Sequence, residues 1–327
     1  MAGFWEQKRV LVAGGCGFVG SHLVERLLGL GASVIVADLH PDSMQRFLSH
    51  VADDVEYLAG DLRERAFADR AVASAEAVFN MAAVVGGVHY NSTHPGSLFT
   101  ENVTIGLTLL EAARRAGVER YCVVSSACVY PRFPKVPTAE DQGFLDDPEV
   151  TNIGYGWAKR VLELQGRFYA EQYGMKIAVA RPYNIYGPRD DFDWETSHVI
   201  PALIRKVVEG QDPIEVWGDG SQTRSFFYVT DAVEALLGLL EKHLSPEPVN
   251  LGTDEEVSIA DLIRRIVRIA GSPAELRFNT DRPRGQPRRK GDFTLARQRI
   301  GRQPAVGLDE GLRRTIEWYR RERAKQP

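Results

Sequence analysis

"VLVAGGCGFVGSHLVERLL", residues 10–28, places a cluster of glycines between an apolar run and an amphipathic segment. The first residues predict a buried β-strand, and the last residues predict a helix that begins directly after the glycines. Gly14, Gly17 and Gly20 carry no Cβ atom, so backbone amides and the helix N-terminus can approach a diphosphate. Tight strand-to-helix turns also use glycine for geometry alone. The stretch indicates a dinucleotide-binding turn if the residues around it agree.

Short β-branched runs alternate with segments of helical periodicity along the first half of the chain. This alternation predicts an α/β fold with a doubly wound parallel (Rossmann) sheet. Two long segments, 97–116 and 155–173, carry apolar residues at helical spacing and are expected to be the longest helices. The expected strands lie at 9–14, 33–38, 55–60, 77–83, 120–126 and 176–182.

The pattern changes after Pro182, where prolines, glycines and arginines become frequent. We expect residues 1–182 to form a nucleotide-binding domain and residues 183–327 to form a smaller, partly interleaved α/β domain for the substrate. Residues 228–252 have the pattern of one more helix and strand, and they are expected to return to the first domain.

Composition narrows the class of protein. The chain has 327 residues, with 40 basic and 44 acidic side chains, so neither nucleic acid nor an anionic membrane is expected as a partner. No stretch is long and apolar enough to span a bilayer, and a cytoplasmic location is expected. The three cysteines have no metal-ligand spacing, so neither a disulfide framework nor a metal site is expected.

The second expected strand, "SVIVAD", ends on Asp38. A carboxylate at this place, about 20 residues after the glycine turn, accepts hydrogen bonds from two ribose hydroxyls. Leu39 and His40 follow instead of an arginine, which favours NAD over NADP as the cofactor. Asp61 and Leu62 are expected near the adenine, although Asp61 could equally cap a helix.

Tyr155 and Lys159 in "GYGWAKRVLEL" lie one helical turn apart, so the ammonium can lower the pKa of the phenol and bind a cofactor ribose. A solvated lysine beside a half-buried tyrosine would have the same spacing. Ser126, at the end of the preceding strand, makes the arrangement typical of hydride-transfer enzymes.

With these residues the sequence resembles the extended short-chain dehydrogenase/reductase family, and within it the NAD-dependent epimerases and dehydratases. The motifs that carry the resemblance are GGCGFVG (14–20), NMAA (80–83), SSA (125–127), YGWAK (155–159) and RPYNIYGP (181–188).

The resemblance covers nearly the whole chain and implies an enzyme that modifies nucleotide sugars. It implies that Ser126, Tyr155 and Lys159 form the hydride-transfer group. It further implies cofactor contacts by Phe18, Val19, Ala82 and Tyr183, and substrate contacts by Gly87, Ser126, Asn184 and Trp217.

Ala127 and Cys128 follow Ser126, whereas the dehydratases and decarboxylases of the family carry acidic residues there. Two groups of the family, the GDP-mannose 3,5-epimerases and the GDP-fucose synthases, use a cysteine at this place. "SSACVYP" resembles the former, and "TSHVIPALIRK" resembles the latter, whose acid/base partner corresponds to His198. The sequence is therefore a hybrid of the two.

Chemistry gives Cys128 a role, because the hydrogens beside a ketone are acidic and a thiolate can remove one. His198 could return a proton from the opposite face of the sugar. Ser197 is the expected N-cap of the following helix, whose positive end would favour a neutral imidazole. A merely capping or exposed histidine is the alternative.

Arg224 and Arg288 are expected to bind the diphosphate of the substrate, since arginine forks match phosphate oxygens. A solvated basic face is the alternative for Arg288 and its neighbours.

Together these features predict an NAD-dependent nucleotide-sugar epimerase similar to the GDP-hexose 3,5-epimerases. The alternatives are a GDP-4-keto-6-deoxyhexose epimerase/reductase, a nucleotide-sugar 4-epimerase, and an inactive cofactor-binding regulator. The resemblance also implies a homodimer that pairs through 97–116 and 155–173.

Overall fold

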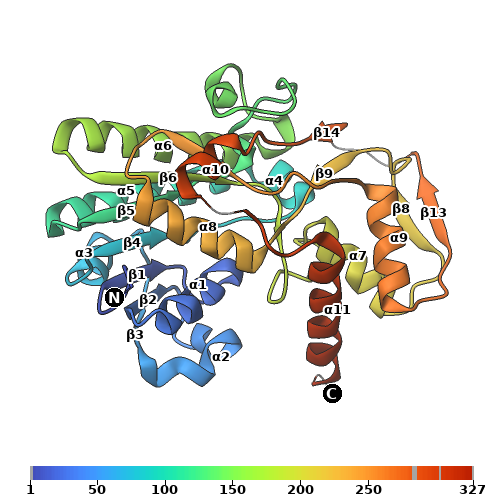
Figure 1. Cartoon of the computed structure of the whole chain (residues 1–327), viewed down its shortest axis with the longest axis horizontal. Helices are drawn as coiled ribbons and strands as arrows, with labels where there is room; N and C mark the ends of the chain where they lie inside the picture. Colours follow the sequence, from blue (N-terminus) through green and yellow to red (C-terminus); the bar gives the residue numbers. More distant parts are fainter. Residues whose placement is uncertain (1–2, 282–285, 302, 326–327) are drawn as a thin grey trace.

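The computed structural model describes residues 3–281, 286–301 and 303–325. Its centre is a seven-stranded sheet in which every neighbouring pair is parallel (Figure 1). The strand order reverses on the two sides of β1, which places a ligand crevice at the carboxyl ends of β1 and β4. The doubly wound fold is confirmed. In spatial order the strands are β11 (Pro248–Leu251), β6 (Lys176–Pro182), β5 (Arg120–Val124), β4 (Ala77–Asn80), β1 (Arg9–Ala13), β2 (Ser33–Asp38) and β3 (Val55–Ala59).

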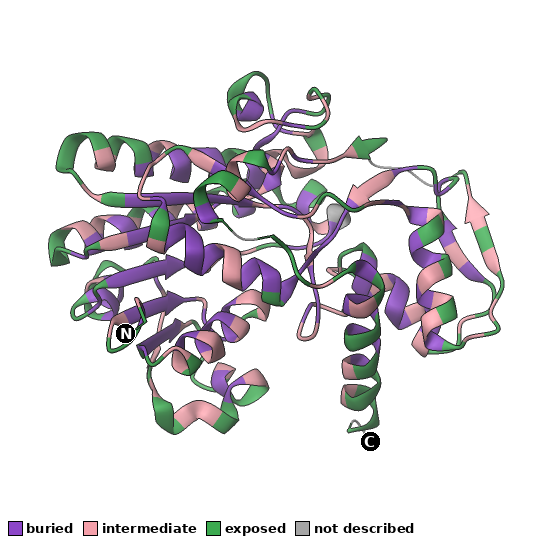
Figure 2. Ribbon diagram, viewed as in Figure 1, coloured by how far each residue is buried: buried purple, intermediate pink, exposed green. Residues whose placement is uncertain are grey.

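Helices cover both faces of this sheet, as its apolar strands require. Val10 and Val12 point to one face, and Leu11 and Ala13 point to the other, because side chains alternate along a strand. The sheet is accordingly buried on both sides (Figure 2). The first face packs against α1 (Phe18–Gly29), α2 (Ser43–Phe47), α8 (Val229–Lys242) and α10 (Thr294–Ile300), and the second against α3 (Arg65–Val72), α5 (Pro95–Ala116) and α6 (Ile153–Tyr173).

A second apolar core lies beside the carboxyl ends of the main sheet and is built from the C-terminal half of the chain (Figure 1). Its helices are α7 (Val199–Val208), α9 (Ile259–Ala270) and α11 (Leu308–Ala324). They pack with three small sheets, which pair β7 (Ile185–Tyr186) with β10 (Phe227–Tyr228), β8 (Ile214–Trp217) with β13 (Leu276–Asn279), and β9 (Thr223–Ser225) with both β12 (Glu256–Ser258) and β14 (Arg288–Arg289).

Shorter elements complete the chain. One is the helix α4 (Val88–Thr93), and the others are the 3-10 turns η1 (Ser49–Asp54), η2 (Ala127–Val129), η3 (Glu140–Phe144) and η4 (Val150–Asn152). The predicted boundary between residues 182 and 183 falls where β6 ends, and it stays a prediction. Strand β11 lies far beyond that boundary in sequence, yet it pairs with β6 in the main sheet.

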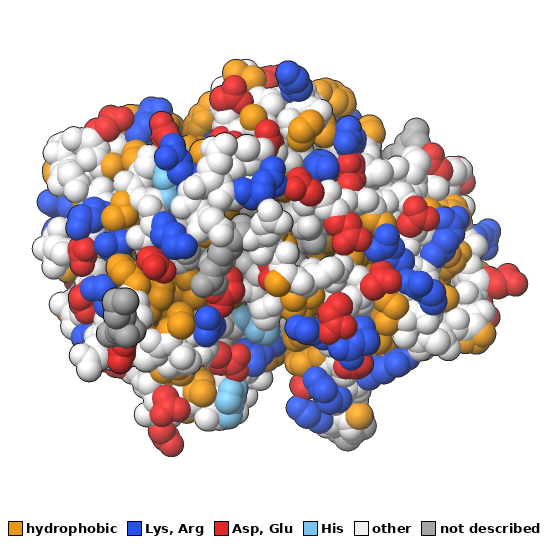
Figure 3. Space-filling view, in the orientation of Figure 1, with side chains coloured by type: hydrophobic (Ala, Val, Ile, Leu, Met, Phe, Trp, Pro, Cys, Tyr) orange, Lys and Arg blue, Asp and Glu red, His pale blue; other side chains and the backbone are white. Residues whose placement is uncertain are grey.

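The described residues contain no helix with the length and apolar character needed to cross a membrane. Basic and acidic side chains are interspersed over most of the face shown in Figure 3, in keeping with the small net charge of −4.

A buried ion pair connects the main sheet to α6. The Arg181 guanidinium donates two hydrogen bonds to the Glu163 carboxylate, from Nε to Oε1 at 2.9 Å and from Nη2 to Oε2 at 2.7 Å. Both side chains are almost fully buried, at 1% and 4% exposure. Ser125 donates to Glu163 at 2.5 Å, and Arg181 donates to the Tyr130 hydroxyl at 2.8 Å. The pair therefore ties α6 to the ends of both β5 and β6.

Replacing Glu163 by glutamine should destabilise the protein by about 3–5 kcal/mol, because it leaves the buried charge of Arg181 uncompensated. Urea unfolding followed by circular dichroism measures this loss. The matched control is Glu171→Gln on the same helix, where Arg167 and Glu171 are largely exposed and 3.9 Å apart, so a loss of less than about 0.5 kcal/mol is expected. Equal losses in the two variants would contradict the prediction.

Candidate active site

The glycine turn between β1 and α1 is shaped to hold a diphosphate. Gly14 has a φ of +73°, and a Cβ there would lie 2.7 Å from the Cα of Ala82. A Cβ on Gly20 would lie 2.2 Å from the Gly14 carbonyl oxygen. Gly17 differs, because its Cβ would meet only that carbonyl oxygen, at 3.3 Å, and would otherwise occupy open space at the N-cap of α1. The turn is thus a cradle that a side chain at Gly17 would fill, and the dinucleotide fits it.

Asp38 is held in place at the end of β2. Its Oδ2 accepts a hydrogen bond from the Cys16 amide at 2.9 Å, and its Oδ1 accepts one from the Leu39 amide at 2.8 Å. Each carboxylate oxygen can accept a second bond, so Asp38 suits the two hydroxyls of an unphosphorylated ribose. Burial, followed by the charge of Asp38, raises the pKa of the Cys16 thiol to about 12, which keeps this cysteine neutral.

The residues expected near the adenine lie in the loop after β3. Leu62 is buried. The Asp61 carboxylate pairs with the Arg63 guanidinium at 2.7 Å, and this hydrogen bonding lowers the pKa of Asp61. The alternative that Asp61 caps a helix is wrong, because α3 begins at Arg65 with Glu64 at its N-cap. Phe18 and Val19 begin α1 and pack against the second apolar core.

Tyr155 and Lys159 lie on the first turns of α6, and both are buried. The Lys159 ammonium is 5.3 Å from the centre of the Tyr155 ring and donates to the Val124 carbonyl oxygen at 2.9 Å. Burial lowers the pKa of Lys159 to about 8, although the negative charges of Cys128 and Glu163 oppose the change.

The expected lowering of the Tyr155 pKa is not found. Burial raises the pKa of the phenol, and the negative charge of Cys128 raises it further. The physical reason is that the Lys159 ammonium is directed at the Val124 carbonyl, while the phenol lies in a dry environment.

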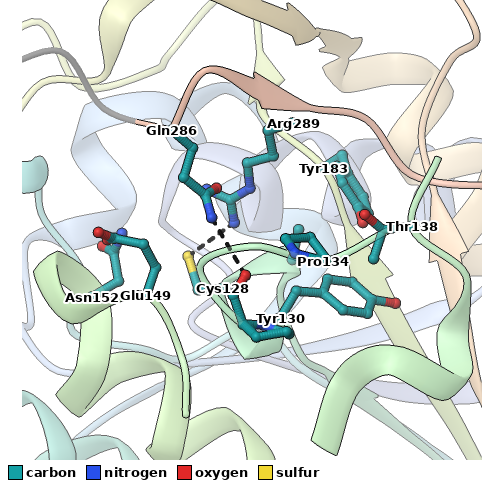
Figure 4. A pocket seen from close by; sticks show the side chains of 11 residues that line it. Cys128, Tyr130, Pro134, Thr138, Glu149, Asn152, Tyr183, Gln286 and Arg289 are labelled. Atoms are coloured by element: carbon teal, nitrogen blue, oxygen red, sulfur yellow. Dashed lines mark hydrogen bonds between the residues drawn. The ribbon is translucent and has the colours of Figure 1, made fainter. Parts of the chain in front are cut away.

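Cys128 lies in η2, just beyond the end of β5. The Ser126 hydroxyl oxygen accepts a hydrogen bond from the Cys128 amide at 3.1 Å. The Arg289 guanidinium donates to the Cys128 sulfur at 3.5 Å (Figure 4). Burial alone would raise the pKa of the thiol, but Arg289, Ser126 and the charge of His198 outweigh it and lower the pKa. At a given pH, the thiolate fraction of Cys128 is therefore larger than that of an ordinary cysteine.

Arg289, rather than the predicted Arg288, is the arginine that enters the site. The two residues form β14, where successive side chains point in opposite directions. Arg288 is half exposed and pairs with the Glu256 carboxylate at 2.8 Å. Arg289 points to Cys128 instead. The "RRK" cluster marked the region, but only the register of β14 shows which arginine faces inward.

His198 is itself the N-cap of α7, so the expectation that Ser197 takes this position is wrong. Its Nδ1 lies 3.9 Å from Oδ1 of Asp190, a buried carboxylate that the sequence did not point to. Desolvation of the ring by the surrounding protein would lower the pKa of His198. The interaction with Asp190 and, next, the charge of Cys128 act in the opposite direction and more strongly, so the pKa is raised. The expected lowering of the His198 pKa is therefore not found, because a carboxylate lies close to the ring and favours its charged form.

A small pocket opens beside Cys128 (Figure 4). Gln286 and Arg289 approach it from the C-terminal half of the chain, and Glu149 and Asn152 lie on the other side of Cys128. This mixture of hydrogen-bond donors and acceptors suits the hydroxyls of a sugar. The pocket is lined by Ala127, Cys128, Tyr130, Pro131, Pro134, Thr138, Glu149, Asn152, Tyr183, Gln286 and Arg289.

Arg224 on β9 is near Arg289. Burial, followed by the positive charge of Arg289, lowers the pKa of Arg224 to about 10. Its Nη1 donates to the Thr223 carbonyl at 2.7 Å, and among the residues that the structure describes no carboxylate forms an ion pair with it. The Arg224 guanidinium, which no described carboxylate compensates, therefore provides an environment for an anion.

The other predicted substrate residues surround this region less directly. Asn184 has a φ of +30° and donates from its side chain to the Ser225 carbonyl at 2.8 Å. A Cβ on Gly87 would lie 2.9 Å from the Ser197 carbonyl oxygen, so Gly87 contacts the segment that carries His198. Trp217 ends β8 and is half exposed. Tyr183 is buried next to the pocket, and its hydroxyl has no hydrogen-bond partner among the residues that the structure describes.

Comparison with known proteins gives the family. Residues 10–252 match the model of the NAD dependent epimerase/dehydratase family. The chain is 34% identical to a GDP-L-fucose synthase from Sinorhizobium fredii, over 95% of each chain. It is 31% identical to GDP-mannose 3,5-epimerase 1 from Oryza sativa subsp. indica, over 99% of this chain and 85% of the relative.

A solved structure, the UDP-glucose 4-epimerase of Thermotoga maritima with UDP-glucose, superposes with a TM-score of 0.87 and 29% identity. The superposition covers 96% of this chain and 99% of that chain. The chain belongs to the NAD-dependent epimerase/dehydratase family, whose members modify nucleotide sugars by epimerisation, dehydration or reduction. The prediction of NAD as the cofactor is confirmed.

Cys128 should be alkylated by iodoacetamide with a rate–pH midpoint below that of the unfolded chain, since the folded site lowers the pKa of this thiol. Arg289→Met should move the midpoint to higher pH, because it removes the nearest positive charge. Mass spectrometry of the labelled peptides measures the rates and separates Cys128 from the buried Cys16 and Cys122.

Arg288→Met is the matched control, because this neighbouring arginine is paired with Glu256 at the surface. Its midpoint should equal that of the unsubstituted protein. An unchanged midpoint in Arg289→Met would show that Arg289 does not stabilise the thiolate.

Proposed function

We propose that the protein is an NAD-dependent nucleotide-sugar epimerase that inverts carbons next to a transient 4-keto group of a GDP-hexose. The observation that carries the proposal is the charge beside each of two residues: the Arg289 guanidinium donates to the Cys128 sulfur at 3.5 Å and lowers the pKa of the thiol, and the Asp190 carboxylate lies 3.9 Å from Nδ1 of His198 and raises the pKa of the imidazole. A base and an acid of this kind are what inversion beside a ketone requires.

When bound, NAD supplies the reversible oxidation of a sugar hydroxyl to a ketone. Tyr155 is the residue that takes the proton of that hydroxyl, and Ser126 hydrogen-bonds the same oxygen. The Lys159 ammonium, one turn further along α6, stabilises the phenolate form in which Tyr155 accepts that proton. The raised pKa of Tyr155 makes this charge compensation necessary.

Once the ketone is present, Cys128 and His198 act on the neighbouring carbons. The Cys128 thiolate removes a hydrogen as a proton, and the electrons move toward the carbonyl oxygen. The His198 imidazolium returns a proton on the opposite face, which inverts the carbon. Arg289 keeps Cys128 in the thiolate form between turnovers.

Two of the relatives and the charge of the site support a GDP-sugar as the substrate. The GDP-sugar enzymes among the relatives match over nearly the whole chain. Arg224 offers positive charge to the diphosphate. Arg289 lies near Arg224 and takes the diphosphate-binding role that was expected of Arg288. Asp38 would repel the 2′-phosphate of NADP, so the site favours NAD. This preference supports a reaction that begins with oxidation by NAD and restores NAD at the end of each turnover.

A second candidate is a GDP-4-keto-6-deoxyhexose epimerase/reductase. The observation that favours it is His198, which corresponds to the acid of the GDP-fucose synthases and has the Asp190 carboxylate 3.9 Å from its Nδ1. A simple 4-epimerase would use Cys128 only as a pocket wall. The charges that lower the pKa of Cys128 have no purpose in that reaction.

Incubation with GDP-, UDP- and dTDP-hexoses in deuterated water, without added cofactor, should place deuterium on the carbons beside C4 of a GDP-hexose. Cys128→Ser should reduce this exchange by roughly 100-fold or more, because a hydroxyl is a far weaker acid than a thiol. Mass spectrometry and NMR of the recovered sugar locate the label.

If Cys128→Ser exchanged substrate hydrogens at the wild-type rate, the thiol would be only a wall of the pocket. In that case 4-epimerisation would be the better proposal. Exchange only with 4-keto-6-deoxy sugar nucleotides, together with stoichiometric consumption of NADPH in preference to NADH, would support the epimerase/reductase instead.

We also propose that the protein is a homodimer that pairs through α5 and α6. These helices pack side by side and expose apolar side chains, among them Phe99, Leu107 and Phe168 at 37%, 40% and 49% exposure (Figure 1).

Light scattering at micromolar concentration should give the mass of a dimer. Leu107→Glu should shift it to the monomer, whereas Leu39→Glu, at an exposed leucine outside both helices, should not. A monomeric unsubstituted protein would contradict the proposal.

A further inference from the structure

Asp190 is a buried carboxylate beside His198. It is 4% exposed, and its Oδ1 accepts a hydrogen bond from the Asp191 amide at 2.8 Å while lying 3.9 Å from Nδ1 of His198. Its Oδ2 is buried and has no hydrogen-bond partner within the described part of the chain. A buried carboxylate that is only partly satisfied costs stability, so its presence at the site calls for a functional account.

His198 is the cation that compensates Asp190. Burial raises the pKa of Asp190, and the interaction with His198 opposes that change. The charged groups that act on the His198 ring are Asp190 and Asp191 from the loop before α7, and Cys128 from η2. Asp191 is already engaged, because its Oδ2 accepts from the Thr196 hydroxyl at 2.5 Å. Asp190 is therefore the acid whose hydrogen-bonding capacity remains for His198.

The loop that carries Asp190, residues 187–191, is fixed against the cofactor-binding helix. Arg189 takes a left-handed φ of +72° and donates to Oε1 of Glu25 on α1 at 2.7 Å. His22 on the same helix lies with Nε2 3.0 Å from the Pro188 carbonyl oxygen. Burial lowers the pKa of His22 to about 4, so this ring is neutral and donates through Nε2. Asp190 is thus held on a rigid support rather than on a free loop.

We propose that Asp190 is a positioning residue that holds His198 through Nδ1 and leaves Nε2 protonated as the donor for the carbon being inverted. The inference rests on the proposed function, because it assigns the means by which His198 returns a proton. His198 is half exposed, so its outer edge is open to a substrate. An aspartate that fixes one ring nitrogen determines which nitrogen carries the transferable proton.

The first test needs no substrate. In protein labelled with ¹³C-histidine, the NMR titration of His198, assigned by its loss in His198→Asn, should move to lower pH by more than about 1 unit in Asp190→Asn. Removing a negative charge destabilises the imidazolium, which sets the direction. Asp191→Asn, one residue away, is the matched control and should give a smaller shift, because Asp191 acts on His198 more weakly than Asp190 does.

The second test separates proton removal from proton return. GDP- and dTDP-linked 4-keto-6-deoxyhexoses, which bypass the oxidation step, are incubated in deuterated water, and both exchange and inversion are measured. Asp190→Asn should keep exchange through Cys128 but lower the ratio of inversion to exchange roughly 10-fold at neutral pH. The ratio should recover at lower pH, where His198 is again protonated. A purely structural role would lower exchange and inversion together.

The outcomes distinguish the inference from the proposed function. Absence of exchange in the unsubstituted protein with every probe would refute the Cys128 and His198 chemistry, whatever the titration shows. An unchanged His198 titration in Asp190→Asn, or a shift no larger than in Asp191→Asn, would overturn the inference. A ratio of inversion to exchange in Asp190→Asn that equals the wild-type ratio at all pH values would also overturn the inference. Asp190→Glu keeps the negative charge, so it should have a ratio of inversion to exchange between those of Asp190→Asn and the unsubstituted protein.

Discussion

The Glu163–Arg181 ion pair is the interaction on which the geometry of the active site depends. It is buried between α6 and the main sheet, and it joins the helix that carries Tyr155 and Lys159 to the strand end that leads into Ser126. Because a buried pair is costly to separate, α6 cannot slide along the sheet without leaving a charge uncompensated. The fold thus fixes the catalytic helix with a directional contact, whereas the surrounding apolar packing alone would tolerate small shifts.

The site is also organised by charge. A positive group approaches the cysteine sulfur, and a negative group approaches the histidine, so each of the two residues is biased toward the form it needs for proton transfer. Neither bias comes from desolvation by the surrounding protein, which opposes both changes. Both come from groups on other elements, Arg289 on β14 and Asp190 in the loop before α7. The reactive pair is therefore a product of the tertiary structure, and each partner has its own support.

The sequence predicted what depends on local pattern. Each of the six expected strands coincides with a strand of the main sheet, and the long helices begin two residues earlier than expected, at Pro95 and Ile153. What it missed depends on contacts between distant segments. Choosing Arg289 over Arg288 requires the register of a two-residue strand. Asp190 follows Arg189, which adopts a left-handed conformation and fixes the loop by its bond to Glu25. The His198 pKa was predicted from the helix end alone, without the carboxylate 3.9 Å away.

Arg289 lies 161 residues after Cys128 in the chain, on a strand that pairs with β9. A chain emerging from the ribosome completes the strands of the nucleotide-binding half, and the cysteine with them, long before this arginine is synthesised. Until the C-terminal segment docks, the thiol lacks the Arg289 guanidinium, whose charge lowers its pKa in the complete structure. The reactivity of Cys128 consequently depends on the docking of β14, and the rate at which the thiol is alkylated reports on that step of assembly.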